Sequence, residues 1–309
     1  MGLVVMAVAA SVAALTGCGS SSDVTYDTSS PGADALTVYA GTGSYRSILK
    51  FVSDKGLAAG VHLTVVDAPA DADAKIAAGQ GDLAFFQHVP AFDADVAAGS
   101  IKDLSVVSAV DVVPYGLYSS RWHDLKDTSG WVNSGLGADN ASGRSLPHGS
   151  RIAVPDTVTG AARALYLLQS AALVRLDRRF GGTTVPDLTI TQSNVLDSPR
   201  HLSLAPVSYA QYVGDIYRNY DAVVLAPDDA AKAGLRPDRD ALALEPGQGN
   251  PYAHVLVAPA RLAGDHRVLE LARALESPQV AAFLENTYHG ADIPAARSTT
   301  NRAPVSTGP

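Results

Sequence analysis

Arg163 is the first of three features in this sequence that could bind a small charged molecule. It lies in the segment 155–165, where a predicted strand passes into a predicted helix. Free backbone N–H groups and the dipole at a helix start attract anions, and a guanidinium in the first turn can bind a carboxylate through two hydrogen bonds. The alternative interpretation is an exposed helical arginine that binds nothing.

The second feature is an aromatic run that ends in an imidazole. Phe85, Phe86 and His88 follow a predicted strand and precede Pro90. Two rings and an imidazole at the end of a strand could line an apolar pocket in which a few polar groups fix the orientation of a ligand. The alternative is that the two phenylalanines face opposite sides of a core and that His88 lies in a solvated loop.

The third feature is the extended segment from Asn250 to His254. Alternate residues of a strand project to the same side, so Tyr252 and His254 would share one face and could form an opposite wall of the same site. A strand face toward solvent explains the pattern equally well. The eight histidines are scattered singly, and no nucleophile elbow, zinc-protease motif or phosphate loop occurs. The sequence therefore predicts neither an enzyme nor a metal site nor a cofactor.

Strand and helix patterns alternate along most of the chain. This alternation is typical of the α/β class, and we expect a mostly parallel sheet with helices on both faces. The glycine-rich segment 129–149 is predicted to be an exposed loop. Ligands of open α/β sheets bind beyond the carboxyl ends of strands, so residues that follow strands are the first candidates for a site. The predicted strands are 36–40, 61–66, 82–86, 105–112, 116–119, 150–154, 188–192, 222–225 and 253–257, and the predicted helices are 48–52, 73–78, 159–172, 266–275 and 279–288.

The N-terminal segment predicts export and a lipid anchor. Residues 1–17 are apolar, although they lack Lys and Arg, and they end in small residues just before Cys18, the single cysteine of the chain. This is the pattern of a bacterial lipoprotein signal, cut before a cysteine that then carries the lipid. A short membrane anchor is the alternative, but the stretch is shorter than the ~20 residues that span a bilayer.

Composition excludes some partners. The net charge of -8 argues against a nucleic-acid surface, which needs clustered basic residues. Residues 18–35 are rich in Ser, Asp and Gly and are predicted to form a flexible tether, and residues 298–309 a flexible tail.

Several runs together resemble the NLPA lipoprotein family, the methionine-binding lipoproteins of ABC uptake systems. The matching runs lie in family order and cover roughly 36–296; they are 81–90, 113–119, 152–155 with 162–165, 240–245 and 250–252. The resemblance implies a two-lobed, type II periplasmic-binding-protein fold with a central hinge and a ligand cleft. It also implies that lobe 1 comprises 36–116 and 246–297, and that lobe 2 comprises 117–245.

The resemblance assigns roles to the three features. The residue matching Arg163 pairs with the ligand carboxylate, and the run 85–88 lines the side-chain pocket. Tyr115 lies where the chain would cross between lobes. The residues predicted to bind the ligand are therefore Phe85, Phe86, His88, Tyr115, Arg163, Tyr252 and His254.

Three positions depart from the family pattern. Gly160, Ala226 and His254 stand where family members usually have asparagines that hold the amino-acid backbone of the ligand. Each lost hydrogen bond is worth about 1 kcal/mol. His254 could supply one of these bonds or select a different ligand.

The sequence thus predicts a solute-binding lipoprotein of an ABC importer, anchored to the outer face of the cytoplasmic membrane through Cys18. It would bind a methionine-like amino acid or a short peptide and deliver it to permease and ATPase subunits. The alternative is a surface-exposed lipoprotein of the same fold that acts as an interaction module without transport.

Overall fold

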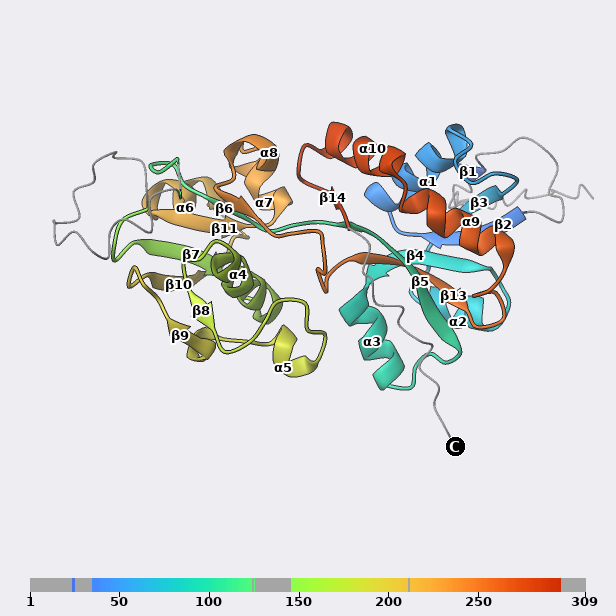
Figure 1. The fold of residues 1–309 in the computed structure, drawn as a ribbon, viewed down its shortest axis with the longest axis horizontal. Helices are drawn as coiled ribbons and strands as arrows, with labels where there is room; N and C mark the ends of the chain where they lie inside the picture. Colours follow the sequence, from blue (N-terminus) through green and yellow to red (C-terminus); the bar gives the residue numbers. More distant parts are fainter. Residues whose placement is uncertain (1–23, 26–34, 124, 126–145, 211, 296–309) are drawn as a thin grey trace, which may run out of the picture.

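The protein has two α/β lobes that lie side by side along its long axis (Figure 1). This computed structural model describes residues 24–25, 35–123, 125, 146–210 and 212–295. Cys18 and most of the predicted loop 129–149 lie outside the described residues. Each lobe is built on its own sheet, and a further sheet of two short antiparallel strands accompanies the second sheet.

The first lobe has a seven-stranded sheet in the order β1-β3-β2-β4-β13-β5-β14. Strands β3, β2 and β4 run parallel, whereas the other pairs are antiparallel. The strands are β1 (Val24–Thr25), β2 (Ala35–Ala40), β3 (His62–Asp67), β4 (Leu83–His88), β5 (Leu104–Val112), β13 (His254–Pro259) and β14 (Ile293–Pro294).

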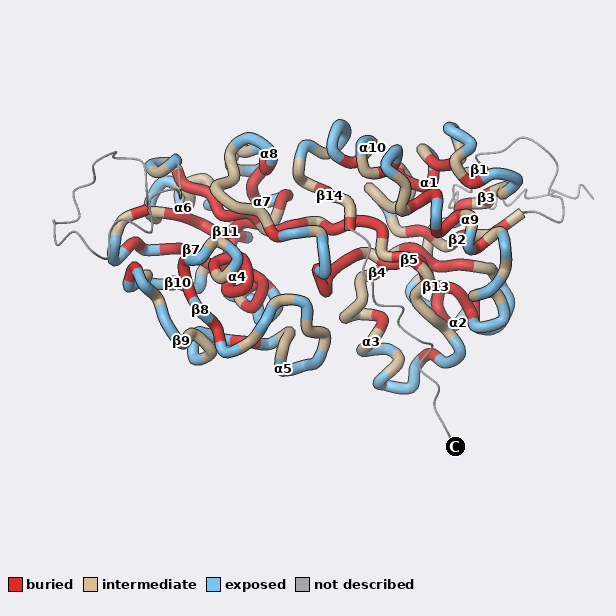
Figure 2. The backbone as a smooth tube through the Cα atoms, viewed as in Figure 1, coloured by how far each residue is buried: buried red, intermediate tan, exposed pale blue. Residues whose placement is uncertain are grey.

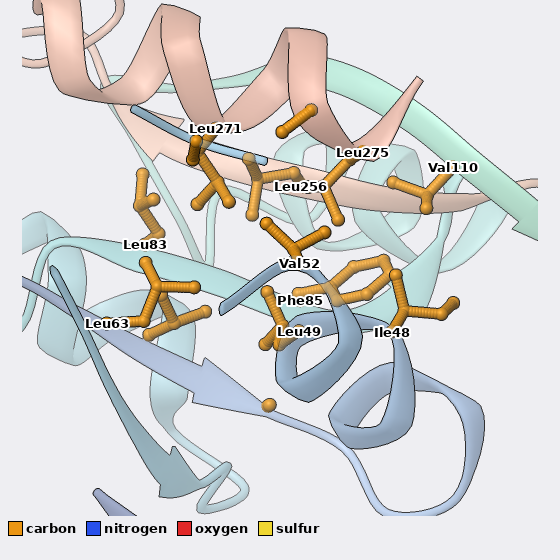
Figure 3. Close-up of a cluster of buried hydrophobic side chains, with 14 of the residues drawn as sticks. Ile48, Leu49, Val52, Leu63, Leu83, Phe85, Val110, Leu256, Leu271 and Leu275 are labelled. Carbon is orange, nitrogen blue, oxygen red and sulfur yellow. The ribbon is translucent and has the colours of Figure 1, made fainter. Parts of the chain in front are cut away.

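Helices cover both faces of this first sheet. Apolar side chains of α1 (Ser44–Asp54), α9 (His266–Leu275) and α10 (Pro278–Tyr288) pack on one face, in the core that Figure 3 shows. Residues of α2 (Ala72–Ala77) and α3 (Val89–Ala97) pack on the other face. Buried and half-buried residues alternate along β2, as the two-residue period of a strand requires. Its buried residues pack into the core between this sheet and α1, α9 and α10.

The second lobe has a five-stranded mixed sheet in the order β10-β7-β11-β6-β12. A core cluster that includes α4 covers one face, and a cluster that includes α6 and α7 covers the other. The sheet strands are β6 (Gly116–Tyr118), β7 (Arg151–Pro155), β10 (Ser203–Val207), β11 (Ala222–Leu225) and β12 (Ala243–Leu244), and the two-stranded sheet pairs β8 (Arg175–Leu176) with β9 (Val195–Asp197). The helices are α4 (Val158–Ser170), α5 (Val185–Leu188), α6 (Val213–Asn219), α7 (Pro227–Lys232), α8 (Pro237–Asp240) and the 3-10 turn η1 (Gln192–Asn194).

Three local expectations from the sequence are wrong. Neither sheet is mostly parallel. The strands β6 and β13, each of which follows a segment that joins the two lobes, pair antiparallel with both of their neighbours. The segment 188–192 is no strand; its β-branched residues link α5 to η1, and Ile190 packs into the second core. Within the predicted tether, β1 pairs with β3, whose outer edge offers unpaired backbone groups.

Two segments carry the chain between the lobes. One leads from β5 to β6, and the other leads from β12 back to β13 (Figure 1). Most residues from 110 to 119 are buried, as Figure 2 shows for the strand that joins the lobes. In the part of the chain that the structure describes, no helix has the length and apolar character needed to cross a membrane.

Candidate functional site

Arg163 lies on α4 and reaches the segments that join the lobes. Its Nε donates to Glu245 Oε1 at 3.0 Å, and its Nη2 donates to the carbonyl oxygen of Val113 at 2.8 Å and also to Glu245 Oε2. The side chain of Arg163 is 11% exposed and that of Glu245 is fully buried. The arginine is therefore held by a buried ion pair rather than exposed on a helix.

Two tyrosine rings hold the guanidinium between them. Its Cζ lies 4.2 Å from the ring centroid of Tyr115 and 4.5 Å from that of Tyr252, within the range of cation–π attraction. Burial lowers the pKa of Arg163, but the charge and hydrogen bonds of Glu245 together with the two tyrosines outweigh it, so the pKa is raised. Glu245 and Val113 occupy Nε and Nη2, whereas Nη1 has no hydrogen-bond partner among the described residues.

The segments that cross between the lobes bind each other at this point. The backbone N–H of Tyr115 donates to Glu245 Oε2, and the backbone N–H of Glu245 donates to the carbonyl oxygen of Tyr115, each at 2.9 Å. Glu245 thus bridges Arg163 and both crossings.

His88 lies on the first lobe, next to Tyr252. The two ring centroids are 5.9 Å apart in an edge-to-face arrangement. His88 also caps α3, since its Nδ1 accepts a hydrogen bond from the backbone N–H of Ala91 at 3.1 Å. Burial lowers the pKa of His88, and the positive charge of Arg163 lowers it further. The imidazole is therefore neutral near pH 7.

His254 is the first residue of β13, which lies between β4 and β5 in the first sheet. It is in register with His88 on β4 and with Asp111 on β5. Its Nδ1 lies 2.7 Å from Oδ2 of Asp111, and its ring centroid lies 4.5 Å from that of Tyr45. Burial lowers the pKa of His254 to about 4.

The two phenylalanines lie elsewhere. Phe85 is fully buried among side chains of α1, α9 and β13 (Figure 3). Its ring contacts that of Tyr45 edge-on, and Tyr45 in turn contacts His254. Phe86 packs half-buried against the cluster on the opposite face of the sheet. Phe85 faces one core and Phe86 the other, because alternate residues of β4 point to opposite faces of the sheet. That they line a ligand pocket stays a prediction. The five other predicted residues, His88, Tyr115, Arg163, Tyr252 and His254, form one cluster.

Four residues near this cluster were given no role by the sequence. Glu245 was visible only as the end of a matching run, and Tyr45 lies in the first turn of α1. Asp111 and Asp292 are 0% and 2% exposed, and their carboxyl groups lie next to each other. A single aspartate in a strand pattern gives no sign that it is buried, so only the packing reveals this pair.

Packing explains one departure from the family pattern. A Cβ on Gly160 would lie 2.6 Å from Pro155 Cβ and 2.7 Å from Thr157 Oγ1, and Thr157 caps α4 through the N–H of Gly160. An asparagine therefore has no room at this position. Ala226 stands just before α7 and makes no side-chain cap bond.

Substitution of Gly160 by Ala tests this close approach. Alanine in a helix is normally about 1 kcal/mol better than glycine, but overpacking against the rigid Pro155 ring costs about 1–3 kcal/mol. We expect a net loss of stability in urea unfolding. Ser170 to Ala, at the end of the same helix, is the control and should change stability by less than about 1 kcal/mol. A G160A variant more stable than the wild type contradicts the clash.

A cavity of ≈ 260 Å³ opens elsewhere, on the second lobe. Its walls come from the end of β7, the start of α4, the segment 190–192 and β10, and none of the clustered residues lines it. No group of three or more His, Cys, Asp or Glu side chains suited to a metal occurs in the described residues.

Two α/β lobes, two crossings and a polar cluster at the crossings define a substrate-binding protein of the two-lobed periplasmic type. The NlpA lipoprotein family model matches residues 42–296. The chain belongs to the NlpA lipoprotein family, whose members are substrate-binding lipoproteins of ABC transporters and not enzymes.

Individual relatives agree with this family. The chain is 31% identical to membrane lipoprotein TpN32 of Treponema pallidum over 216 residues, 69% of this chain and 70% of that protein. It is 26% identical to the methionine-binding lipoprotein MetQ of Bacillus subtilis, with 69% and 70% covered. A solved nutrient-binding protein of Burkholderia cenocepacia, bound to methionine, is 25% identical with a TM-score of 0.53 and coverage of 84% and 99%.

Proposed function

We propose that this chain is the extracytoplasmic solute-binding lipoprotein of an ABC importer and that it binds a methionine-like amino acid or a short peptide between its lobes. The names of its relatives support the ligand class, since MetQ and the Burkholderia protein are described as binding methionine. Lipid on Cys18 would tether it to the outer face of the cytoplasmic membrane, and permease and ATPase subunits would be its partners.

The geometry of Arg163 is the observation that carries this proposal. Glu245 binds one side of the guanidinium and fixes its plane between Tyr115 and Tyr252. The N–H groups of Nη1 have no partner among the described residues and can donate to a ligand carboxylate. A guanidinium that is already positioned loses little entropy when it binds, which favours affinity.

Closure of the lobes is the proposed mechanism. Lobe 1 would comprise 36–116 and 246–297, and lobe 2 would comprise 117–245. His88 and His254 lie on the first sheet, whereas Arg163 belongs to the second lobe. A ligand that contacts both lobes stabilises the closed state by its higher affinity for that state. The hydroxyl of Tyr252, buried without a partner among the described residues, would gain one from the ligand or from water.

Arg163 to Lys tests the proposed role of Nη1. Lysine can still pair with Glu245 but has no second nitrogen to offer a ligand. Calorimetry with a panel of L- and D-amino acids and methionine-containing dipeptides identifies the ligand, and the variant should bind it at least tenfold more weakly, about 1.4 kcal/mol.

The control is the amide of the same ligand. Its uncharged carboxamide makes no ion pair with Arg163, so the R163K substitution removes little of its binding energy. Its affinity should change much less than that of the free acid. Equal losses for both compounds contradict the role of Arg163. If the wild type binds no member of the panel, the surface lipoprotein without transport becomes the better explanation.

A further inference from the structure

The two histidines at the centre of the cluster are held in opposite ways. His88 accepts a hydrogen bond at Nδ1 from the backbone N–H of Ala91, so the neutral ring carries its proton on Nε2. His254 instead places Nδ1 against a carboxylate oxygen of Asp111 at 2.7 Å, which favours a proton on Nδ1. His88 therefore offers a donor at Nε2, whereas His254 offers an acceptor.

The second nitrogen of His254 remains accessible. The side chain is 12% exposed, and Nε2 has no hydrogen-bond partner among the described residues and is not one of the sealed side-chain atoms. The ring stacks on Tyr45, which holds its plane. Besides burial, the positive charge of Arg163 lowers the pKa of both histidines, and Tyr252 contacts both Arg163 and His88.

Asp292 keeps Asp111 available as an acceptor. Both carboxyl groups are buried and adjacent, with Ser44 beside them. Two like charges this close cannot both ionise easily, so one of the two carboxyl groups holds a proton. Burial and the charge of Asp111 raise the pKa of Asp292 to about 9, whereas burial raises that of Asp111 to about 7. The pair therefore holds one proton over a wide pH range, and Oδ2 of Asp111, 2.7 Å from Nδ1 of His254, is placed to accept a hydrogen bond from it.

We propose that Asp111 is a positioning residue that holds His254 as the hydrogen-bond acceptor for the ammonium group of the bound ligand. This inference rests on the proposed function and adds a ligand requirement, namely a free ammonium group beside the carboxylate. Asp111 itself, fully buried behind His254, does not touch the ligand. The imidazole would thereby accept a hydrogen bond from the ligand in place of the side-chain amide oxygen of the asparagine that family members usually have at this position.

The protonation of His254 is the first test, and it needs no ligand. Long-range nitrogen–proton correlation spectra of histidine-labelled protein at pH 8, with H254N to assign the signals, should show the proton of His254 on Nδ1. In Asp111→Asn the amide N–H would donate to Nδ1, and the proton should move to Nε2. A wild-type ring protonated on Nε2, or on both nitrogens, overturns the proposal.

Binding is the second test, with the tightest-binding amino acid of the panel and its deamino analogue as probes. D111N should bind the amino acid at least tenfold more weakly and the analogue within about twofold of the wild type. An asparagine at 254 accepts through its own amide oxygen, so D111N/H254N should bind like H254N. Asp73→Asn, which changes a buried carboxyl bonded to Gln87, is the control and should leave both affinities unchanged.

The outcomes separate the two proposals. If the wild type binds amino acids but D111N binds them equally well, or the deamino analogue binds as tightly as the parent, the role of Asp111 is wrong and the proposed function stands. If no amino acid binds to the wild type, the proposed function fails and the ammonium site fails with it.

Discussion

Substitution of Glu245 by Gln is expected to lower the free energy of unfolding by about 3–5 kcal/mol, the cost of leaving one charge of a buried pair uncompensated. Glu245 is fully buried and accepts hydrogen bonds from Arg163 and from the backbone of Tyr115. Glutamine keeps the shape but loses the charge and one acceptor oxygen. Urea unfolding at pH 7 measures the effect.

A surface pair provides the control for this experiment. Glu270 and Arg273 form an ion pair one turn apart on α9, where Arg273 is largely exposed. Glu270→Gln removes the same charge but should cost less than about 1 kcal/mol, because solvent screens exposed pairs. If E245Q is no more harmful than E270Q, the pair that holds Arg163 contributes little to the fold.

Substitution of Asp292 by Asn is expected to stabilise the protein increasingly as the pH rises. Burial and the neighbouring Asp111 raise the pKa of Asp292 from 3.8 to about 9. Between these values the native state holds a proton that the unfolded state has released, so the stability of the wild type falls as pH rises from about 4 to about 9. Asparagine has no proton to lose. D292N should match the wild type near pH 4 and exceed it by up to about 7 kcal/mol at pH 9.

Thermal unfolding from pH 4 to pH 9 measures this slope. Asp265 is the control of opposite sign, since hydrogen bonds from Arg267 lower its pKa to about 2. Asp265→Asn should therefore lose stability above pH 4 rather than gain it, by about 1 kcal/mol at most because the group is partly exposed. A stability difference between D292N and the wild type that does not change with pH would show that Asp292 is ionised throughout.

Local patterns predicted most of the secondary structure. The strand 222–225 and the helix 266–275 have the predicted bounds, and most other predicted elements differ by one or two residues. Several elements, among them α3, β10 and α6, were not predicted. These elements have strong apolar periods and clear end signals, such as Ser277 and Pro278 at the start of α10. The segment 188–192 failed because its β-branched residues are equally suited to link two short helices.

The sequence by itself determined the α/β class, the family and five of the residues that meet at the crossings, because periodicity and motif order are properties of the chain. The tertiary structure alone decided which charges pair. It placed Phe85 in a core, bound Arg163 to Glu245 from 82 residues away, and buried Asp111 beside Asp292 and His254. Burial and pairing depend on how the two sheets bring distant segments together, and no local pattern contains that information.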